Sequence, residues 1–166
     1  GEQACDPAQV APTEQCQWRQ RRVVAEVHDE NAARLGGVSG HAGLFSTAGE
    51  VARFGQLFLD GGAPLLQPAT VTEMRQVQAQ AGDLRRGLGF LLWSPDPEAS
   101  SNAFSKSAFG HTGFTGTSLW VDPERALVVA LLTNEVYHGR VNRRIGQLRV
   151  AVHGALVQAV DALLAP

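Results

Sequence analysis

Apolar residues in the C-terminal part of the chain recur at helical spacing. A period of about 3.6 residues predicts one long helix over about 141–164, with a continuous apolar stripe that needs a packing partner. The stripe consists of Val141, Ile145, Leu148, Val152, Leu156 and Leu163. Just before it, residues 126–133 are apolar on both faces, which predicts a buried central strand. The helix is therefore expected to pack on the sheet that contains this strand.

Two shorter helices are expected upstream. Thr47 and Glu50 have the spacing of a capping box, and the helix that they begin should end at 60–62, an Asp-Gly-Gly sequence. A second helix is predicted from residue 68 or 69 to about 80. The apolar faces of the two helices comprise Val51, Phe54 and Phe58 in the first and Val71, Met74 and Val77 in the second.

Strand patterns dominate the region between these helices and the last one. Apolar runs predict strands at 87–93, 109–115 and 118–121. Residues 122–125, with Pro at the second position, fit a tight turn, and strands joined by so short a connection must be antiparallel. Residues 94–107 should form a polar loop. The fold class is therefore α+β, an antiparallel sheet packed by helices within one domain over residues 1–166.

The N-terminal third has weaker patterns. Residues 1–22 should be largely irregular, and a short extended piece is expected at 22–27. Residues 36–43 contain four glycines, which indicates a loop with positive φ angles or a close backbone approach.

Composition excludes several classes of function. Of the 166 residues, 44% are hydrophobic and 18% are charged, and the net charge is −2, with no basic stripe that would indicate nucleic-acid binding. No apolar run approaches the roughly 18 residues of a membrane span. Residues 1–12 do not resemble a signal peptide, which says nothing about where the protein resides. Cys5 and Cys16 could form a disulfide or stay reduced, and they are poorly placed for a metal.

The sharpest candidate for chemistry is the sequence Phe-Gly-His-Thr-Gly-Phe-Thr-Gly at 109–116. His-Thr-Gly on a strand, followed by a hairpin and a terminal helix, resembles the third motif of the serine β-lactamase and penicillin-binding protein family. The similarity extends through residue 123 and to the stretches 11–14, 27–32 and 36–47, in the family's order. It resembles most closely the class C-related esterases and D-alanyl-D-alanine carboxypeptidase-like proteins.

The resemblance implies a role for each residue of the motif. Phe114 would supply a backbone N–H to an oxyanion, Thr112 a hydroxyl to the substrate, and His111 a group that orients a carboxylate or the general base. Gly113 would let the substrate lie beside the strand. Gly110 is assigned to substrate binding with it. The alternative for His111 is a solvent-facing residue beside a turn.

The family's nucleophile is absent from this sequence. No Ser has a Lys three residues later, and the only Tyr, Tyr137, is not followed by the family's Tyr-x-Asn pattern. By resemblance both motifs lie upstream, so the chain is expected to be the C-terminal half of a serine hydrolase acting on amide or ester substrates. Alone it should be inactive. The rival hypothesis is a binding or regulatory module that keeps the pocket and has lost the nucleophile.

The remaining predictions concern the glycine-rich loop, the other histidines and the partners of the chain. By resemblance Gly40 and His41 lie near the substrate pocket, although His41 could equally cap a turn. His28 is interpreted as tying down a loop, and His138 and His153 as surface or helix-face residues. No metal or organic cofactor is expected. The expected ligand is a small-molecule or peptidoglycan-type substrate, and a missing N-terminal half or self-association should cover the exposed sheet. The resemblance favours an exported bacterial protein.

Overall fold

The computed structural model describes residues 6–141 and 143–165, and it confirms an α+β fold. Its main sheet has six antiparallel strands in the order β3-β4-β5-β6-β7-β8, so that each strand pairs with its neighbours along the chain. The strands are β3 (Ala79–Ala81), β4 (Leu84–Arg86), β5 (Leu91–Leu92), β6 (Phe109–Thr112), β7 (Ser118–Asp122) and β8 (Leu127–Leu131). The short turn between β7 and β8 contains the 3-10 helix η2 (Pro123–Arg125), at the position where the sequence predicts a turn.

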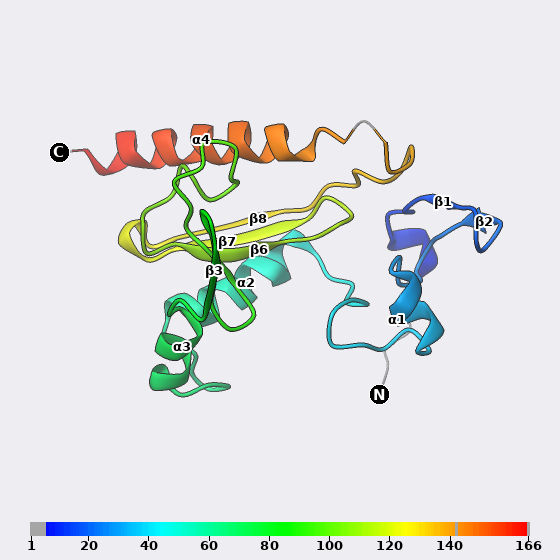
Figure 1. The fold of residues 1–166 in the computed structure, drawn as a ribbon, viewed down its shortest axis with the longest axis horizontal. Helices are drawn as coiled ribbons and strands as arrows, with labels where there is room; N and C mark the ends of the chain where they lie inside the picture. Colours follow the sequence, from blue (N-terminus) through cyan, green and yellow to red (C-terminus); the bar gives the residue numbers. More distant parts are fainter. Residues whose placement is uncertain (1–5, 142, 166) are drawn as a thin grey trace.

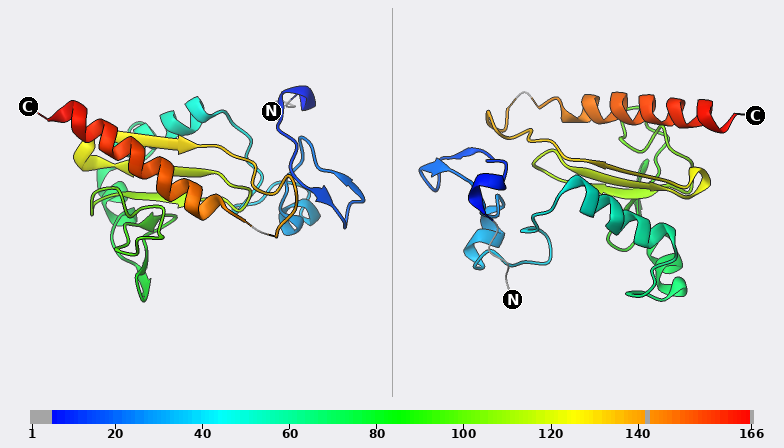
Figure 2. Two further views of the ribbon diagram at one scale, coloured as in Figure 1. Left: turned by 90° about the horizontal axis from the view of Figure 1, so that it is seen from above. Right: turned by 180° about the vertical axis from the view of Figure 1, so that it is seen from behind.

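Helices cover both faces of this sheet. Figure 1 shows α4 (Ile145–Leu164) along one face and α2 (Ala48–Leu59) along the other. The helix α3 (Pro68–Met74) continues from the end of α2. The N-terminal segment lies beyond one end of the sheet in all three views (Figures 1 and 2). It contains η1 (Pro7–Gln9), the strand pair β1 (Gln15–Cys16) and β2 (Arg21–Arg22), and α1 (Glu30–Arg34).

The face under α2 has a closed apolar core. It consists of Phe58, Val71, Phe90, Leu92, Phe109 and Val121, all buried, with the rings of Phe58, Phe90 and Phe109 in edge-to-face contact. Gly55 lets α2 approach the sheet closely, because a Cβ there would lie 2.5 Å from Val128 Cγ1. The predicted capping box begins this helix: Thr47 and Glu50 each bond to the other's backbone N–H.

The face under α4 is mixed. An apolar cluster of Phe104, Ala108, Trp120, Val129 and Val157 lies beside buried polar groups. Asp122 is fully buried, and its carboxylate accepts hydrogen bonds from Ser105 N (2.9 Å), Ser105 Oγ and Arg125 Nη1 (2.9 Å). His153 is also fully buried and donates from Nδ1 to Ser100 O (2.7 Å).

The prediction for α4 was right about the helix and wrong about its buried face. The residues that the structure buries are Ile145, Arg149, His153 and Val157. Three leucines of the predicted stripe, Leu148, Leu156 and Leu163, are 45%, 40% and 84% exposed. The surface assignment of His153 is therefore wrong, whereas His138 is exposed as predicted. Periodicity finds an apolar stripe but not whether this chain supplies its partner.

The apolar run at 126–133 is a strand, but it is not central. β8 is the last strand in the sheet order and most of its residues are only half-buried, because no described strand pairs with its outer edge. The sequence of β8 is apolar on both faces, as in a central strand, but the described residues give it one neighbour, β7.

Three boundaries also differ from the predictions. The helix predicted to reach residue 80 ends at Met74, because residues 79–86 form the β3–β4 hairpin, whose turn has Gly82 at φ +58°. The strand predicted at 87–93 is reduced to β5, since positive φ at Gly89 bends the chain before it. The last helix, predicted from about 141, begins at Ile145. Residues 6–22 are irregular apart from η1 and the paired strands β1 and β2. No helix among the described residues could cross a membrane.

Candidate active site

The strand β6 presents part of its edge without a strand partner. β7 pairs with all four of its residues, whereas β5 pairs only with Phe109 and Gly110. On the β5 side, His111 and Thr112 therefore have no neighbouring strand among the described residues. Such an open edge offers backbone groups to an extended ligand. The predicted strand end at 115 is shortened to Thr112, where the hairpin turn begins.

His111 and Thr112 project to opposite faces of the sheet, as alternation along a strand requires. His111 lies opposite Leu119 on the α2 side and is exposed. Its Nδ1 donates to Thr112 O at 2.9 Å, which orients the ring. Thr112 lies opposite Ser118 on the α4 side and is half-buried. A ligand at this edge can therefore reach an imidazole and a hydroxyl from two sides.

The turn after β6 is tightly built around Gly113. Its N–H donates to Thr117 O (2.7 Å), and a Cβ at this position would lie 2.2 Å from Thr117 Oγ1. Arg149 on α4 donates from Nη2 to Gly113 O (2.9 Å) and to Thr117 O (2.6 Å). The backbone N–H of the next residue, Phe114, has no hydrogen-bond partner among the described residues. A fixed turn with one unused N–H is the geometry that an oxyanion-binding donor needs.

The Phe114 side chain is clamped between the N-terminal segment and the segment before α4. Its ring stacks on His28 with 5.8 Å between centroids, and the Arg143 guanidinium carbon lies 4.3 Å from the ring centroid. Arg143 also donates from Nη2 to Phe114 O. These contacts hold both the side chain and the carbonyl, and so they fix the direction of the peptide groups on either side of Phe114.

An ion cluster centred on the buried Glu14 supports this clamp. Glu14 is 8% exposed and accepts hydrogen bonds from His28 Nε2 (2.8 Å) and Arg140 Nε (2.7 Å), while Arg140 also binds Glu30 (2.7 Å). Burial acts to raise the pKa of the Glu14 carboxyl, but hydrogen bonds from Arg140 and His28 outweigh it and hold the pKa below its usual range. Glu14 is therefore ionised at neutral pH, and His28 Nε2 is the donor.

Residues 5–153 match the family described as Beta-lactamase. The chain belongs to the β-lactamase family. The predicted resemblance to a serine β-lactamase or penicillin-binding protein-like hydrolase is thereby confirmed.

Relatives within the β-lactamase family support the hydrolase assignment. The chain is 35% identical over 156 residues to "Putative D-alanyl-D-alanine carboxypeptidase" of Escherichia coli (strain K12), covering 84% of this chain and 35% of that protein. It is 39% identical over 127 residues to "N-acetylmuramyl-L-alanine amidase" of Bacillus subtilis (strain 168), covering 70% and 28% respectively. The chain thus spans about a third of the length of the curated relatives that it matches.

The glycine-rich loop carries the other two predicted site residues. His41 bonds through Nδ1 to Ser39 Oγ (2.6 Å) and through Nε2 to Asp29 Oδ1 (3.0 Å), and it is exposed. Asp29 also caps α1 by accepting from Ala32 N (2.8 Å). Both bonds join His41 to other side chains, and its roles as a turn cap or as part of a substrate pocket both stay predictions. Gly40 has open space around it, and a Cβ there would meet nothing within 4 Å.

Gly110 has a packing reason to be glycine. A Cβ at this position would lie 2.1 Å from Leu119 O and 2.7 Å from the Trp120 ring. Any larger residue would therefore separate β6 from β7. Its assignment to substrate binding stays a prediction.

Sequence reasoning missed the residues that support the turn. Glu14, Arg140, Arg143 and Arg149 gave no signal of their own, because they come from segments as much as 126 residues apart. The local structural role inferred for His28 is consistent with its bond to Glu14. Among the described residues, no cluster of three His, Cys, Asp or Glu side chains could hold a metal ion. Cys16 is buried, and Cys5 lies outside the described residues, as would any pairing between them.

Proposed function

We propose that this chain forms one wall of the active site of a serine acyl hydrolase, with His111, Thr112, Gly113 and Phe114 at the reacting group. The observation that carries the proposal is the open edge of β6 next to a fixed turn whose Phe114 N–H has no partner among the described residues. A substrate laid along this edge would bring its carbonyl oxygen to that N–H.

The chemistry is acyl transfer to a serine followed by hydrolysis. The serine oxygen adds to the carbonyl carbon, and the Phe114 N–H stabilises the negative charge that develops on the carbonyl oxygen. Nε2 of His111 and the hydroxyl of Thr112 are placed to orient the polar groups that flank this carbonyl. Collapse of the tetrahedral intermediate expels the amine or alcohol, and water then releases the acid.

The substrate that we favour is of the peptidoglycan type. Support comes from the names of the relatives, a D-alanyl-D-alanine carboxypeptidase and an N-acetylmuramyl-L-alanine amidase, which both describe cleavage of amide bonds to alanine. The imidazole of His111 and the hydroxyl of Thr112 could bind a carboxyl group, free or in amide linkage, that lies next to the amide to be cleaved.

The nucleophile would come from residues outside this chain. No Ser here has the Ser-x-x-Lys spacing, and Ser105, the Ser next to Lys106, donates its hydroxyl hydrogen to the buried Asp122. A hydroxyl that is committed to a buried carboxylate is poorly placed to attack a substrate. We therefore assign residues 1–166 to one part of a longer domain, the C-terminal half.

A partner for the sheet follows from the same proposal. The outer edge of β8 has no strand next to it among residues 6–141 and 143–165, and Leu148, Leu156 and Leu163 expose the apolar stripe of α4. An exposed edge and an apolar stripe on one molecule favour association. The missing half would cover them in the longer protein, and isolated chains should self-associate. Light scattering after gel filtration should show dimers or larger species, and a monomer at all concentrations would contradict this.

Covalent labelling tests the catalytic proposal. The 166-residue chain, incubated with a fluorophosphonate or a penicillin, should show no adduct by intact mass. The longer protein should be labelled on a serine that precedes Gly1, and His111→Ala should slow that labelling at least about tenfold. His138→Ala, which alters an exposed histidine away from β6, is the matched control.

Three results would count against the proposal. An adduct on a serine of this chain would place the nucleophile within it. Equal labelling rates for His111→Ala and the unaltered longer protein would remove His111 from the site. Failure of the longer protein to be labelled, with reversible binding of a D-alanyl-D-alanine peptide retained, would favour the binding module over the enzyme.

A further inference from the structure

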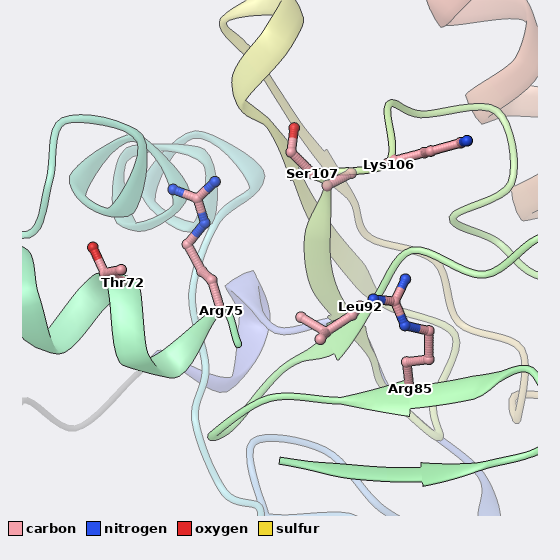
Figure 3. Close-up of a pocket in the computed structure, with 7 residues that line it drawn as sticks. Thr72, Arg75, Arg85, Leu92, Lys106 and Ser107 are labelled. Carbon is pink, nitrogen blue, oxygen red and sulfur yellow. The ribbon is translucent and has the colours of Figure 1, made fainter. Parts of the chain in front are cut away.

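A second concave site lies at the opposite end of β6 from His111. It is a cavity of about 310 Å³ between the end of α3, strands β4 and β5, and the segment that leads into β6. Figure 3 shows Arg75 extending from α3 and Arg85 from β4, with Lys106 and Ser107 on the segment above them. The lining on this side ends at Ala108, so the cavity is separate from the predicted motif at 111–114.

The charges of this cavity are of one sign. Arg75, Arg85 and Lys106 line it, and no acidic residue does. Within the described part of the chain, none of the three forms a salt bridge, whereas Arg125 and Arg140 each bind two carboxylates. The cavity therefore gathers three positive charges without a carboxylate in its lining. Their mutual repulsion favours binding of an anion between them.

The two arginines are held by different elements, which makes the site more than a flexible surface patch. The Arg75 guanidinium carbon lies 4.7 Å from the centroid of the buried Phe109 ring, and this stacking leaves the N–H groups at the edge of the guanidinium plane unused. Arg75 and Arg85 are both half-buried. Burial lowers the pKa of Arg75, as expected for a cation without a partner.

The hydroxyl groups of the cavity are already engaged. Thr72 donates to Pro68 O (3.0 Å) and Ser107 donates to Glu124 Oε1 (3.0 Å). Each hydroxyl oxygen is thus oriented by the bond that it donates. The free donors of the cavity are therefore the guanidinium groups of Arg75 and Arg85, while the Lys106 ammonium lies over the Trp93 ring, 6.0 Å from its centroid.

We propose that this cavity binds a compact, doubly charged oxyanion of the phosphate class. Guanidinium groups bind such anions through paired N–H donors, and two of them on separate elements can engage different oxygens of one tetrahedral group. The volume of about 310 Å³ leaves room for a substituent on the phosphate, so phosphate monoesters fit the same site. This inference does not depend on the acyl-transfer proposal.

The sequence supplies a sharp reporter for this site. Lys106 is the only lysine of the chain, so selective ¹⁵N-lysine labelling gives one backbone amide peak, located on the cavity wall. Titration with inorganic phosphate at constant ionic strength should shift this peak saturably, with a dissociation constant in the millimolar range or tighter. Sodium chloride at the same ionic strength should leave it almost unmoved, since chloride offers no paired acceptors.

Two neighbouring arginines provide matched variants. Arg85→Gln should weaken phosphate binding about tenfold, the loss expected for a charge-assisted hydrogen bond. Arg86→Gln removes the same charge one residue along β4, on the opposite face and outside the cavity, and should leave binding unchanged. Arg75→Gln should weaken binding as Arg85→Gln does, and the amide spectrum verifies that each variant is folded.

Either of two results would overturn the proposal. An unsaturable shift that chloride reproduces would mean general screening of charge. Equal weakening by Arg85→Gln and Arg86→Gln would mean that net charge, and not the cavity, attracts phosphate. A serine label tested on the longer protein reports on His111 alone, so the failure of one proposal would leave the other standing.

Discussion

The two faces of the sheet differ in what holds them together. Under α2 the contacts are apolar and the rings of Phe58, Phe90 and Phe109 interlock. Under α4 the buried face of the helix carries Arg149 and His153 among its apolar residues. Several buried polar atoms on this side have no protein partner within the described residues, namely Ser118 Oγ, Trp120 Nε1, Arg149 Nε and His153 Nε2.

The α2 face mainly stabilises the fold, whereas the α4 face orients the turn next to the candidate site. Each side chain buried in an apolar face stabilises the folded state, and a polar group without a partner there destabilises it. A polar face gains less, but its hydrogen bonds have direction and can fix a turn, as Arg149 fixes the carbonyls of Gly113 and Thr117. The turn beside the candidate active site is held by Arg149 from the α4 face, whereas His111 lies on the α2 face.

The largest effect is expected from the α2 face. Phe109→Ala should lower the free energy of unfolding by about 3–5 kcal/mol, because Phe109 is 0% exposed and its loss leaves a cavity beside the rings of Phe58 and Phe90. Urea denaturation followed by circular dichroism measures the change. Phe109→Leu should lose less and remain folded if the Ala variant does not, and Phe45→Ala, at an exposed ring, is the control. A loss below about 1 kcal/mol for Phe109→Ala would show that this face is not the main core.

The next effect concerns the buried carboxylate of the α4 face. Burial raises the pKa of Asp122, but bonds from Ser105 and Arg125 outweigh it and leave the pKa below its usual range. The group stabilises the fold in its charged form, so this stability is present above about pH 4 and is lost as the pH falls through the lower folded-state pKa.

Asp122→Asn should therefore cost about 2 kcal/mol at pH 7 and flatten the fall of unfolding free energy below pH 4. Urea melts at several pH values measure both. Asp161→Asn, which removes the exposed partner of Arg125, is the matched control and should change stability far less. Equal losses for the two variants would contradict the assignment of the buried network.

The third prediction tests whether Arg149 fixes the turn. Arg149→Met should lower the unfolding free energy by about 1–3 kcal/mol, because the Gly113 carbonyl would lose its buried donor. Chemical shifts of the Phe114 amide should change with it. Arg143→Met, which removes the exposed donor to the Phe114 carbonyl, should cost less stability. A stable variant with an unshifted Phe114 amide would mean that the turn keeps its conformation without Arg149.

The smallest effect is a pH dependence at His153. Burial lowers its pKa, so the unfolded chain takes up a proton at a higher pH than the folded chain does. Stability should therefore be complete above the unfolded pKa of about 6.5 and should decline as the pH falls towards the lower folded value. His153→Gln should remove this decline, and His138→Gln should retain it. If the unfolding free energy of His153→Gln fell between pH 7 and pH 5 as steeply as that of the unaltered chain, the assignment of this decline to His153 would be wrong.

Much of the fold could be predicted from the sequence. The capping box at Thr47 and Glu50, the hairpin through η2 and the long C-terminal helix follow from local rules, because caps, turns and helical periods depend on neighbours in the chain. The end of α3 could not be predicted, since the β3–β4 hairpin competes with the helix for residues after Met74.

The roles of the candidate site residues stay predictions. The sequence singled out the motif at 111–114 by resemblance, and in the structure its first two residues end β6, an interior strand whose β5 side is unpaired there, while the other two lie in the turn that follows. The clamp on Phe114 was invisible, because Glu14, His28 and Arg140 meet only when the two ends of the chain come together.

What the sequence by itself determined is most of the helices and strands and the resemblance to a family of serine hydrolases. Only the tertiary structure decided which face of α4 is buried and that β8 stands at the edge of the sheet. The physical reason is that periodicity records which residues are apolar, whereas burial depends on which surfaces are present to cover them. In this chain, Leu148, Leu156 and Leu163 have an apolar pattern and no described surface to complete it.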